Sequence, residues 1–258
     1  MKGKKIICTI LMLVCASSIA IGAVQLFGQY REYYEGESTY TDLGNYVELP
    51  EEPEDQVPSS VDQTESEGRE WPVVDFVSLQ EANPDIVGWI YIEGTDINYP
   101  VVQGEDNQYY LKHLFNGEWN SSGCIFLDSR NSANFSDRHS IIYGHHMKNG
   151  TMFSGLDHYK KQEFYEAHPT ALLMTPDTNF GVEFFAGYVA SVREEAWKLS
   201  FLSDSEFEDW LAEVRERSCF DSDIEPAVTD RILTLSTCSY EFDNARFVLL
   251  GRLRSEFL

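Results

Sequence analysis

The sequence predicts a mainly β fold with added helices, preceded by a separate apolar segment at the N-terminus. Eight short runs rich in β-branched and aromatic residues follow residue 85, and Gly, Pro, Asn or Asp punctuate the chain around them, which is typical of strands. The runs cover residues 89–94, 97–104, 123–128, 139–145, 170–176, 182–191, 231–238 and 246–253. About eight strands of this length suit a closed barrel or a sandwich, and we expect a β-barrel decorated with helices.

Helices are expected at three places in this fold. Residues 203–218, "SDSEFEDWLAEVRERS", repeat large apolar residues at three- and four-residue spacing behind an acidic start, which predicts an amphipathic helix before the seventh run. Residues 151–168 predict one shorter helix. Residues 74–90 predict a helix, a break at Pro84, and a second helical turn that leads into the sheet.

The N-terminal segment has the length and composition of a membrane span. The run Ile6–Phe27 contains 22 uncharged residues. As a helix it reaches roughly 33 Å at about 1.5 Å per residue, enough to cross a bilayer. Three lysines precede the run and three glutamates follow it, so the positive-inside rule predicts a cytoplasmic N-terminus and an exported remainder. The alternatives are a cleaved signal peptide, whose apolar core is usually shorter, and a lipid attached at Cys15, where Val14 replaces the expected small residue.

The chain is expected to divide into three parts. Residues 1–35 form a cytoplasmic tip and a transmembrane anchor, which predicts a single-pass protein of the cell membrane with its folded domain outside. Residues 36–71 contain "ELPEEPEDQVPSSVDQTESEGRE", which is rich in Glu, Pro and Ser and too poor in apolar residues to offset the entropy lost on folding, so we expect an acidic disordered stalk. Residues 72–258 form the folded domain. The net charge of −24 argues against nucleic acid as a partner, because phosphate binding depends on clustered Lys and Arg.

Five cysteines are present. Cys8 and Cys15 lie in the apolar run, whereas Cys124, Cys219 and Cys238 lie in the exported part. Three exported thiols cannot all pair with one another. A disulfide between Cys124 and Cys219 is compatible with an extracellular setting, and at least one thiol stays available in either case.

Cys238 ends a strand-like run, and an arginine follows eight residues later. Strand alternation places Cys238 on one face and the two leucines of "RILTLSTC" on the other, and the leucine face is the better core candidate. If the following segment turns back as a hairpin about Phe242, Cys238 and Arg246 become cross-strand neighbours. A guanidinium there lowers the free-energy cost of a thiolate and can donate hydrogen bonds to an oxyanion beside the sulfur. Taken alone, the pair is weak evidence for catalysis, because buried cysteines usually behave as small apolar residues and most arginines lie at the surface.

A histidine suited to acid–base chemistry lies in "HSIIYGHHMKNGTMF". His145 follows a strand-like run and a glycine, where the backbone turns and the ring can project into a cleft. An imidazole is needed to deliver a proton to the leaving amine when a thiol attacks an amide. His146 competes for this role, and a loop histidine satisfied by backbone groups is the ordinary interpretation of either residue. No HExxH or CxxC spacing is present, so we expect neither a metal nor another cofactor.

The motif "TLSTC", an arginine on the next strand, and "YGHHMKNGTMF" about ninety residues earlier together resemble the sortase family, specifically its class B. The resemblance covers roughly residues 75–253 and begins with "DFVSLQEANPDIVGWIYIEGTDINYPVVQGEDNQYYL". It implies an eight-stranded sortase-like β-barrel with an N-terminal helical segment and a long helix before the cysteine strand. It also implies that Cys238 is the nucleophile, that His145 is the general acid and base because the family's histidine follows the glycine, and that Arg246 holds the oxyanion and the substrate. Four further positions resemble the groove for the sorting peptide, namely Asn107, Leu111, Tyr143 and Ser236.

The implied activity is that of a membrane-anchored cysteine transpeptidase of a Gram-positive cell surface, in the cysteine-peptidase class of hydrolases. Such an enzyme cleaves a C-terminal sorting motif of secreted proteins after Thr and transfers the protein to an amine of the peptidoglycan cross-bridge or of lipid II. We expect a monomer. The alternatives are a pilin-polymerising sortase and a catalytically inactive peptide-binding surface module. A Cys-His protease of another fold and an L,D-transpeptidase-like enzyme lack their signatures in this sequence.

Overall fold

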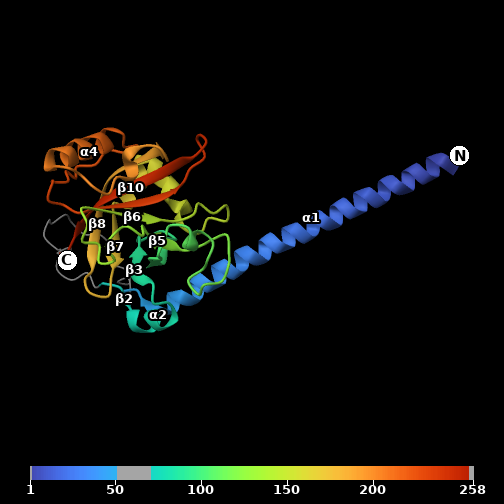
Figure 1. The fold of residues 1–258 in the computed structure, drawn as a ribbon, viewed down its shortest axis with the longest axis horizontal. Coiled ribbons are helices and arrows are strands. Elements are labelled where there is room, and N and C mark those ends of the chain that lie inside the picture. The colour runs from blue at the N-terminus through green and yellow to red at the C-terminus, as the bar shows by residue number, and fades with distance from the viewer. Residues whose placement is uncertain (1, 51–70, 256–258) are drawn as a thin grey trace, which may run out of the picture.

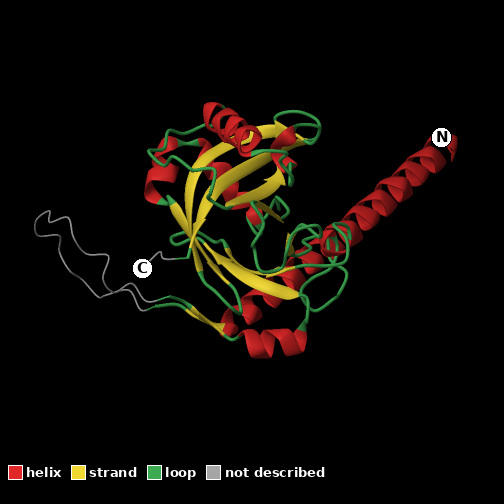
Figure 2. Ribbon diagram, turned by 60° about the vertical axis from the view of Figure 1, so that its left-hand side comes forward, coloured by secondary structure: helices red, strands yellow, loops and turns green. Residues whose placement is uncertain are grey.

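The computed structural model describes residues 2–50 and 71–255, and the side chains from residue 10 onward within them. A closed barrel of eight strands forms the body of the protein (Figures 1 and 2). All eight predicted strands are present, as β3 (Ile86–Tyr91), β4 (Asn98–Val102), β5 (Ile125–Leu127), β6 (His139–Tyr143), β7 (Thr170–Met174), β8 (Phe180–Ser191), β9 (Ile232–Cys238) and β10 (Ala245–Arg254).

The strand order around the barrel is β10-β8-β7-β3-β4-β5-β6-β9. The pairs β4–β5 and β6–β9 are parallel, and the other neighbours are antiparallel. Because parallel neighbours begin and end on the same sides, the last residues of β6 and β9 lie at the same edge of the barrel. Tyr143 is the register partner of Ser236 at this edge. The two segments that follow these strands therefore start from neighbouring points.

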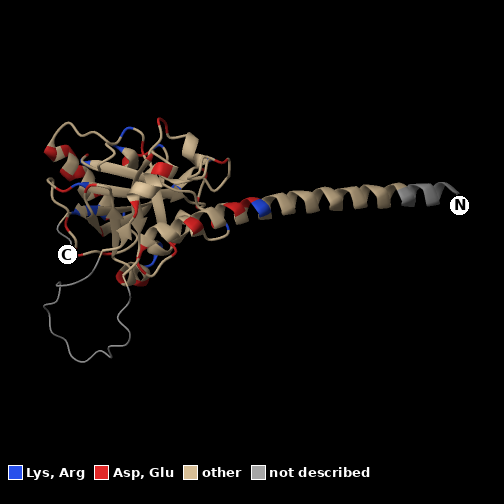
Figure 3. Cartoon of the chain, turned by 90° about the horizontal axis from the view of Figure 1, so that it is seen from below, with Lys and Arg blue, Asp and Glu red and all other residues tan. Residues whose placement is uncertain are grey.

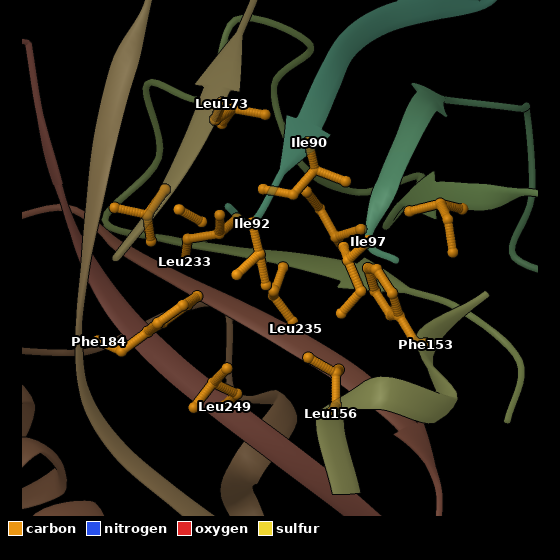
Figure 4. Packing of buried hydrophobic residues seen from close by; sticks show 14 of the residues in the cluster. Ile90, Ile92, Ile97, Phe153, Leu156, Leu173, Phe184, Leu233, Leu235 and Leu249 are labelled. Atoms are coloured by element: carbon orange, nitrogen blue, oxygen red, sulfur yellow. The ribbon is translucent and has the colours of Figure 1, made fainter. Parts of the chain in front are cut away.

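The barrel interior is filled by large apolar side chains from all around the sheet (Figure 4). Leu233 and Leu235 of β9 point into this interior beside Leu249 of β10, which confirms that the leucine face of the cysteine strand is the core face. Burying such a side chain fully contributes about 1.5–3 kcal/mol. The opposite face of β9 starts with Ile232, which packs under a helix in a separate cluster. The outer face thus stays open only toward the end that carries Cys238.

The amphipathic helix is confirmed as α4 (Asp204–Glu216), whose N-cap Ser203 accepts a hydrogen bond from the backbone nitrogen of Glu206. Its four large apolar residues pack on the outside of the barrel. The predicted single helix over residues 151–168 is instead split into a 3₁₀ helix, η3 (Phe153–Lys160), and α3 (Gln162–Ala167), because Lys161 between them is extended. Two further short 3₁₀ helices are η2 (Tyr109–Leu111) and η4 (Glu195–Trp197).

The first helix of the domain, α2 (Phe76–Ala82), is confirmed and is capped by Asp75. The second helical turn predicted after Pro84 is wrong, because β3 starts two residues later. The side-chain oxygen of Asn83 accepts a hydrogen bond from the backbone nitrogen of Asp85 over 2.9 Å. This local bond makes a turn of the segment and leads it directly into the sheet.

A single long helix, α1 (Lys2–Leu43), runs from the N-terminus into the domain (Figure 1). At 1.5 Å per residue its 42 residues extend over about 63 Å. The helix over Ile10–Tyr46 is long and apolar enough to cross a membrane, and none of its most apolar part is buried against the rest of the protein. In Figure 3, the blue and red charged residues of α1 lie at the end of the helix that approaches the barrel.

Residues 36–50 differ from the disordered stalk expected from composition. After α1 the chain forms η1 (Gly44–Tyr46) and β1 (Val47–Glu48), and β1 pairs with β2 (Val73–Val74). Leu43 and Val47 are buried in a cluster with Trp89 of the barrel. Tyr40 meets the ring of Tyr99 edge-on at 5.4 Å, so the end of α1 belongs to the folded unit. The rest of the expected stalk, residues 51–70, lies outside the described residues.

Candidate active site

A pocket of about 340 Å³ opens where β6 and β9 end. All seven site residues predicted from the sequence line it, namely Asn107, Leu111, Tyr143, His145, Ser236, Cys238 and Arg246. Three lining residues were missed by sequence reasoning, which are Phe126, Gly144 and Thr237. The structure therefore brings together residues that lie as much as 139 positions apart in the chain.

The parallel pairing of β6 and β9 explains why a histidine and a cysteine meet here. Tyr143 and Ser236 are register partners at the ends of these strands. His145 and Cys238 each lie two residues further along their chains. The two functional groups thus leave the sheet at the same level, on adjacent strands.

Arg246 reaches the pocket from the neighbouring strand. It is the direct register partner of Cys238 in the antiparallel pair of β9 and β10, as a hairpin centred on Phe242 predicts. The Cβ atoms of such opposed residues lie about 4.5–5.5 Å apart. The guanidinium donates from Nη1 to the carbonyl oxygen of Ala245 over 2.9 Å and forms no ion pair with a carboxylate of the described residues. Its charge is therefore available for an anionic group in the pocket.

The hairpin that joins Cys238 to Arg246 has a defined turn. Asn244 has a positive φ of 64°, and the backbone nitrogen of Ala245 donates to the carbonyl of Phe242 over 3.1 Å. Asn tolerates this left-handed conformation better than most residues. The turn sets the register that places the arginine opposite the cysteine.

Gly144 allows His145 to enter the pocket. A Cβ atom at position 144 would lie 2.6 Å from the ring of Phe153 and still closer to the side chain of Ile125. Only glycine fits between these core residues. The backbone then continues past the core, where the nitrogen of Phe153 donates to the carbonyl of His145 over 3.0 Å.

The His145 ring is oriented by one hydrogen bond. Its Nε2 atom lies 2.8 Å from the carbonyl oxygen of Leu111. A carbonyl only accepts, so Nε2 carries a proton, and Nδ1 remains as the second site of the half-buried ring. The imidazole can therefore gain and lose a proton at Nδ1 while Leu111 keeps its orientation.

His146 turns to another part of the molecule. Its Nε2 atom lies 3.1 Å from Asp157 Oδ2, and its ring meets Tyr240 edge-on at 5.2 Å. It lines a different cavity, of about 580 Å³, which does not include Cys238. The structure thus separates the two adjacent histidines, and the one that follows the glycine shares the pocket with the cysteine.

Tyr143 is anchored by an ion pair between the buried Asp128 and the exposed Arg130, which sequence reasoning missed. Its hydroxyl donates to Asp128 Oδ2 over 2.9 Å, and Arg130 donates to both oxygens of the same carboxylate at 2.8 and 2.9 Å. Burial raises the pKa of Asp128, but the hydrogen bonds from Arg130 and Tyr143 outweigh this effect and leave the pKa below its ordinary value. Burial, and next the charge of Asp128, raise the pKa of Tyr143. Tyr143 therefore lines the pocket as an uncharged side chain whose hydroxyl is already hydrogen-bonded to Asp128.

The remaining lining residues offer polar groups at fixed places. The side-chain oxygen of Asn107 accepts from the backbone nitrogen of Ser129 over 2.8 Å, which leaves its Nδ2 without a partner among the described residues. Ser236 is buried, and its hydroxyl oxygen lies 3.4 Å from Nε1 of Trp197, a residue without any local sequence signal. A peptide in this pocket would meet one free amide donor beside the apolar side chain of Leu111.

Cys124 and Cys219 are free and lie elsewhere. Cys124 is buried and receives a hydrogen bond from Tyr40 over 3.1 Å, whereas Cys219 is exposed. Burial raises the pKa of Cys124 to about 12. No disulfide joins the two. Within the described ranges, no group of three or more His, Cys, Asp or Glu side chains is arranged to hold a metal ion.

Comparison with known proteins identifies the family. No protein-family model matches the chain. The sortase B of Listeria monocytogenes is 41% identical over 177 residues, which are 68% of this chain and 72% of that protein. The crystal structure of Staphylococcus aureus sortase B superposes with a TM-score of 0.67 at 36% identity, over 70% of this chain and 86% of that one. A Bacillus anthracis sortase B superposes with a TM-score of 0.73 at 31% identity, over 88% of this chain and all of that one. The eight-stranded barrel, its cysteine pocket and these relatives show that the chain belongs to the sortase family, class B, and is a sortase transpeptidase.

Proposed function

We propose that this transpeptidase cleaves a sorting signal near the C-terminus of secreted proteins after Thr and joins the new end to an amine of the cell wall. The observation that carries the proposal is the single pocket in which Cys238, His145 and Arg246 meet. A thiol, an imidazole and an unpaired guanidinium are the groups that acyl transfer through a thioester requires.

In the first half-reaction, Cys238 Sγ attacks the carbonyl carbon of the Thr residue as a thiolate. Arg246 stabilises the oxyanion of the tetrahedral intermediate, since its charge has no carboxylate partner in the described part of the chain. The intermediate collapses when the C–N bond breaks. His145 donates its Nδ1 proton to the leaving amine, while Nε2 keeps its bond to Leu111. The products are a thioester on Cys238 and a free amine end.

In the second half-reaction, an acceptor amine attacks the thioester carbonyl. His145 takes the proton that this amine loses, the C–S bond breaks, and Cys238 leaves as the thiolate with which the cycle began. The two half-reactions together exchange one amide bond for another, so the reaction consumes no oxidant and its balance requires no metal or other cofactor. Water in place of the amine would give hydrolysis.

Solved relatives support the two substrates. One structure is a Staphylococcus aureus sortase B–substrate complex, and another is a sortase B complexed with Gly3. By analogy, we assign the donor peptide to the side of the pocket formed by Asn107, Leu111, Tyr143 and Ser236. The acceptor would be an amine of the peptidoglycan cross-bridge or of lipid II.

The location proposed for the enzyme is the cell membrane, with one span and the catalytic domain outside. The large apolar side chains of α1 between Ile10 and Phe27 are all more than half exposed. A contiguous apolar surface of this size needs a nonaqueous environment. The lysines before the span favour a cytoplasmic N-terminus. We propose a monomer, because the barrel closes on itself and leaves no open sheet edge for pairing.

The test is a peptide library of Thr-containing sorting sequences, incubated with the full chain in detergent and with triglycine, and read by mass spectrometry. The expected product is a peptide joined to triglycine directly after Thr. Cys238→Ala and His145→Ala should abolish it. His146→Ala is the matched control and should lose no more than about tenfold, since its ring faces a different cavity. Cleavage at another residue, or equal losses for both histidines, would contradict the proposal.

A further inference from the structure

A cluster of polar and ionisable side chains lies behind the two segments that carry His145 and Cys238. At its centre is Lys160, the last residue of η3. Its Nζ atom lies 2.9 Å from Asp157 Oδ1, 2.5 Å from Glu241 Oε1 and 3.1 Å from Ser239 Oγ. Ser239 also donates from its hydroxyl to Glu241. Lys160 thus contacts both Ser239, the residue directly after Cys238, and the carboxylate of Glu241.

The same cluster reaches the histidine segment. Asp157, which pairs with Lys160, lies 3.1 Å from Nε2 of His146, the residue after His145. The same ring meets Tyr240 edge-on, and the Tyr240 hydroxyl donates to the carbonyl of His146 over 3.4 Å. Residues next to each catalytic group therefore contact one another through two routes, one through Asp157 and Lys160 and one through Tyr240.

The charges and burial of the cluster suit a positioning role better than a stabilising one. The side chains of Lys160 and Glu241 are 27% and 42% exposed. Ion pairs at such exposure contribute roughly 0–1 kcal/mol each to folding. The hydrogen bond from Lys160, and next that from Ser239, lower the pKa of Glu241 to about 2, so the carboxylate is charged at any pH at which a cell lives. The carboxylate thus stays charged, and each contact contributes little to the stability of the fold.

We propose that Lys160 is a positioning residue for transpeptidation, which ties the hairpin loop 239–244 after Cys238 to η3 and, through Asp157, to the loop that carries His145. The proposal rests on the catalytic roles given above to Cys238 and His145. Lys160 does not line the catalytic pocket, so any effect on turnover passes through the side chains it contacts, which also include the ring of Phe247 at 5.5 Å. Apart from the contact of Tyr240 with His146, the side chains of the loop add little anchorage, because Phe242 is exposed.

The expected effect of Lys160→Met in the full chain is a kcat lower by about ten- to a hundredfold, since a displacement of about 1 Å between catalytic groups has this consequence. KM for the donor peptide should change less than about twofold, because Asn107, Leu111 and Tyr143 keep their contacts. Lys160→Arg restores a cation between the two carboxylates and should recover most of kcat. Lys161→Met is the matched control: the neighbouring lysine is exposed and has no ion pair among the described residues, and its loss should leave kcat and KM unchanged.

A double-mutant cycle tests whether Glu241 is the residue through which Lys160 acts on turnover. Glu241→Gln should lower kcat in the same direction, and Lys160→Met combined with Glu241→Gln should be no worse than Lys160→Met alone, because the two residues act as one contact. Losses that multiply would show independent effects and overturn the pairing.

Hydrogen exchange separates this proposal from the proposed function. In detergent-solubilised full chain, Lys160→Met should accelerate exchange at least severalfold at the amides of Ser239 and Phe153, which bond to Ala245 and to His145 at 3.0 Å. The amide of Leu235 in the barrel should not change. This readout needs no peptide turnover, so a wild type that fails to cleave would refute the proposed function and still test the coupling. Unchanged exchange at both amides, an effect on KM alone, or a melting temperature that falls by more than about 5 °C would overturn the positioning role.

Discussion

The carbonyl oxygen of Leu111 accepts a hydrogen bond from Nε2 of His145 over 2.8 Å. Leu111 also lines the pocket, so under the proposed function one residue would both meet the donor peptide and orient the acid–base group. A peptide that displaced η2 would rotate the imidazole with it. Under the proposed function, donor binding at Leu111 and the orientation of the His145 ring would therefore be coupled through this hydrogen bond.

Arg246→Lys is expected to be far more damaging than the retained charge suggests. A planar guanidinium donates two hydrogen bonds in fixed directions, whereas an ammonium is a mobile point charge. If Arg246 serves the oxyanion, its replacement should lower turnover by about 10²–10³, or roughly 2.7–4 kcal/mol of transition-state stabilisation. The measurement pairs peptide turnover with the rate of Cys238 alkylation against pH, for wild type, Arg246→Lys and Arg246→Ala. Near-normal turnover in the lysine variant would reject the oxyanion role.

Gly144→Ala is expected to disable the enzyme without touching a catalytic atom. The new methyl group would overlap Ile125 and the Phe153 ring, and such overpacking typically costs about 1–3 kcal/mol. The backbone shift that relieves it moves His145, so turnover should fall more steeply than stability. Gly155→Ala is the control, because a Cβ there meets only Ile97 at an ordinary 3.7 Å. Thermal melting and turnover would be compared for both variants, and equal behaviour would contradict the steric account.

The buried His139 is expected to make stability depend on pH. It donates from Nδ1 to the carbonyl of Lys198 and accepts from the Thr234 hydroxyl at Nε2, each over 2.7 Å, as a neutral ring. Burial lowers its pKa to about 4. The unfolded chain, with an ordinary histidine pKa near 6.5, then binds the extra proton between about pH 6.5 and 4, so stability falls as pH falls through this window. The shift corresponds to about 3 kcal/mol.

Urea unfolding of wild type and His139→Asn at pH 7 and pH 4 measures this contribution. The variant is less stable at pH 7 and loses less on acidification, so the difference between the two proteins should shrink by about 3 kcal/mol. The many carboxylates titrate equally in both proteins. An unchanged difference would mean that His139 is not buried as a neutral ring.

The end of α1 is expected to contribute to folding. Deletion of residues 1–29 removes the exposed apolar part of the helix, whereas deletion of residues 1–70 also removes Tyr40, Leu43 and Val47. Each full burial of such an apolar side chain contributes about 1.5–3 kcal/mol. The longer deletion should therefore melt at least about 5 °C lower. It should also expose Cys124, which Tyr40 covers, to thiol reagents. Equal melting temperatures and an unreactive Cys124 in both proteins would show that residues 36–50 do not contribute to the folded domain.

The sequence predicted the strands because each is a short apolar run between turn residues. It could not predict that β6 and β9 pair in parallel, since a contact across ninety residues leaves no local trace. The acidic composition gave no sign that the end of α1 is folded, although Tyr40 and Leu43 lie three residues apart, on one face of a helix. A hairpin centred on Phe242 predicted that Arg246 lies opposite Cys238. The glycine before His145 favoured this histidine over His146. Asp128, Arg130 and Trp197 support the pocket through distant contacts, and no motif pointed to them.

The most direct test of the account is the intact mass of the full chain after incubation with an intact sorting peptide that the enzyme cleaves, in the absence of an acceptor amine. We expect an adduct equal to the peptide portion that ends in Thr, located on Cys238, released by hydroxylamine as a thioester, and converted to a new amide when triglycine is added. Cys238→Ala should show neither adduct nor product. Product formation without an adduct on Cys238, or an adduct on Cys124 or Cys219 instead, would contradict the central claim that Cys238 carries the transferred acyl group.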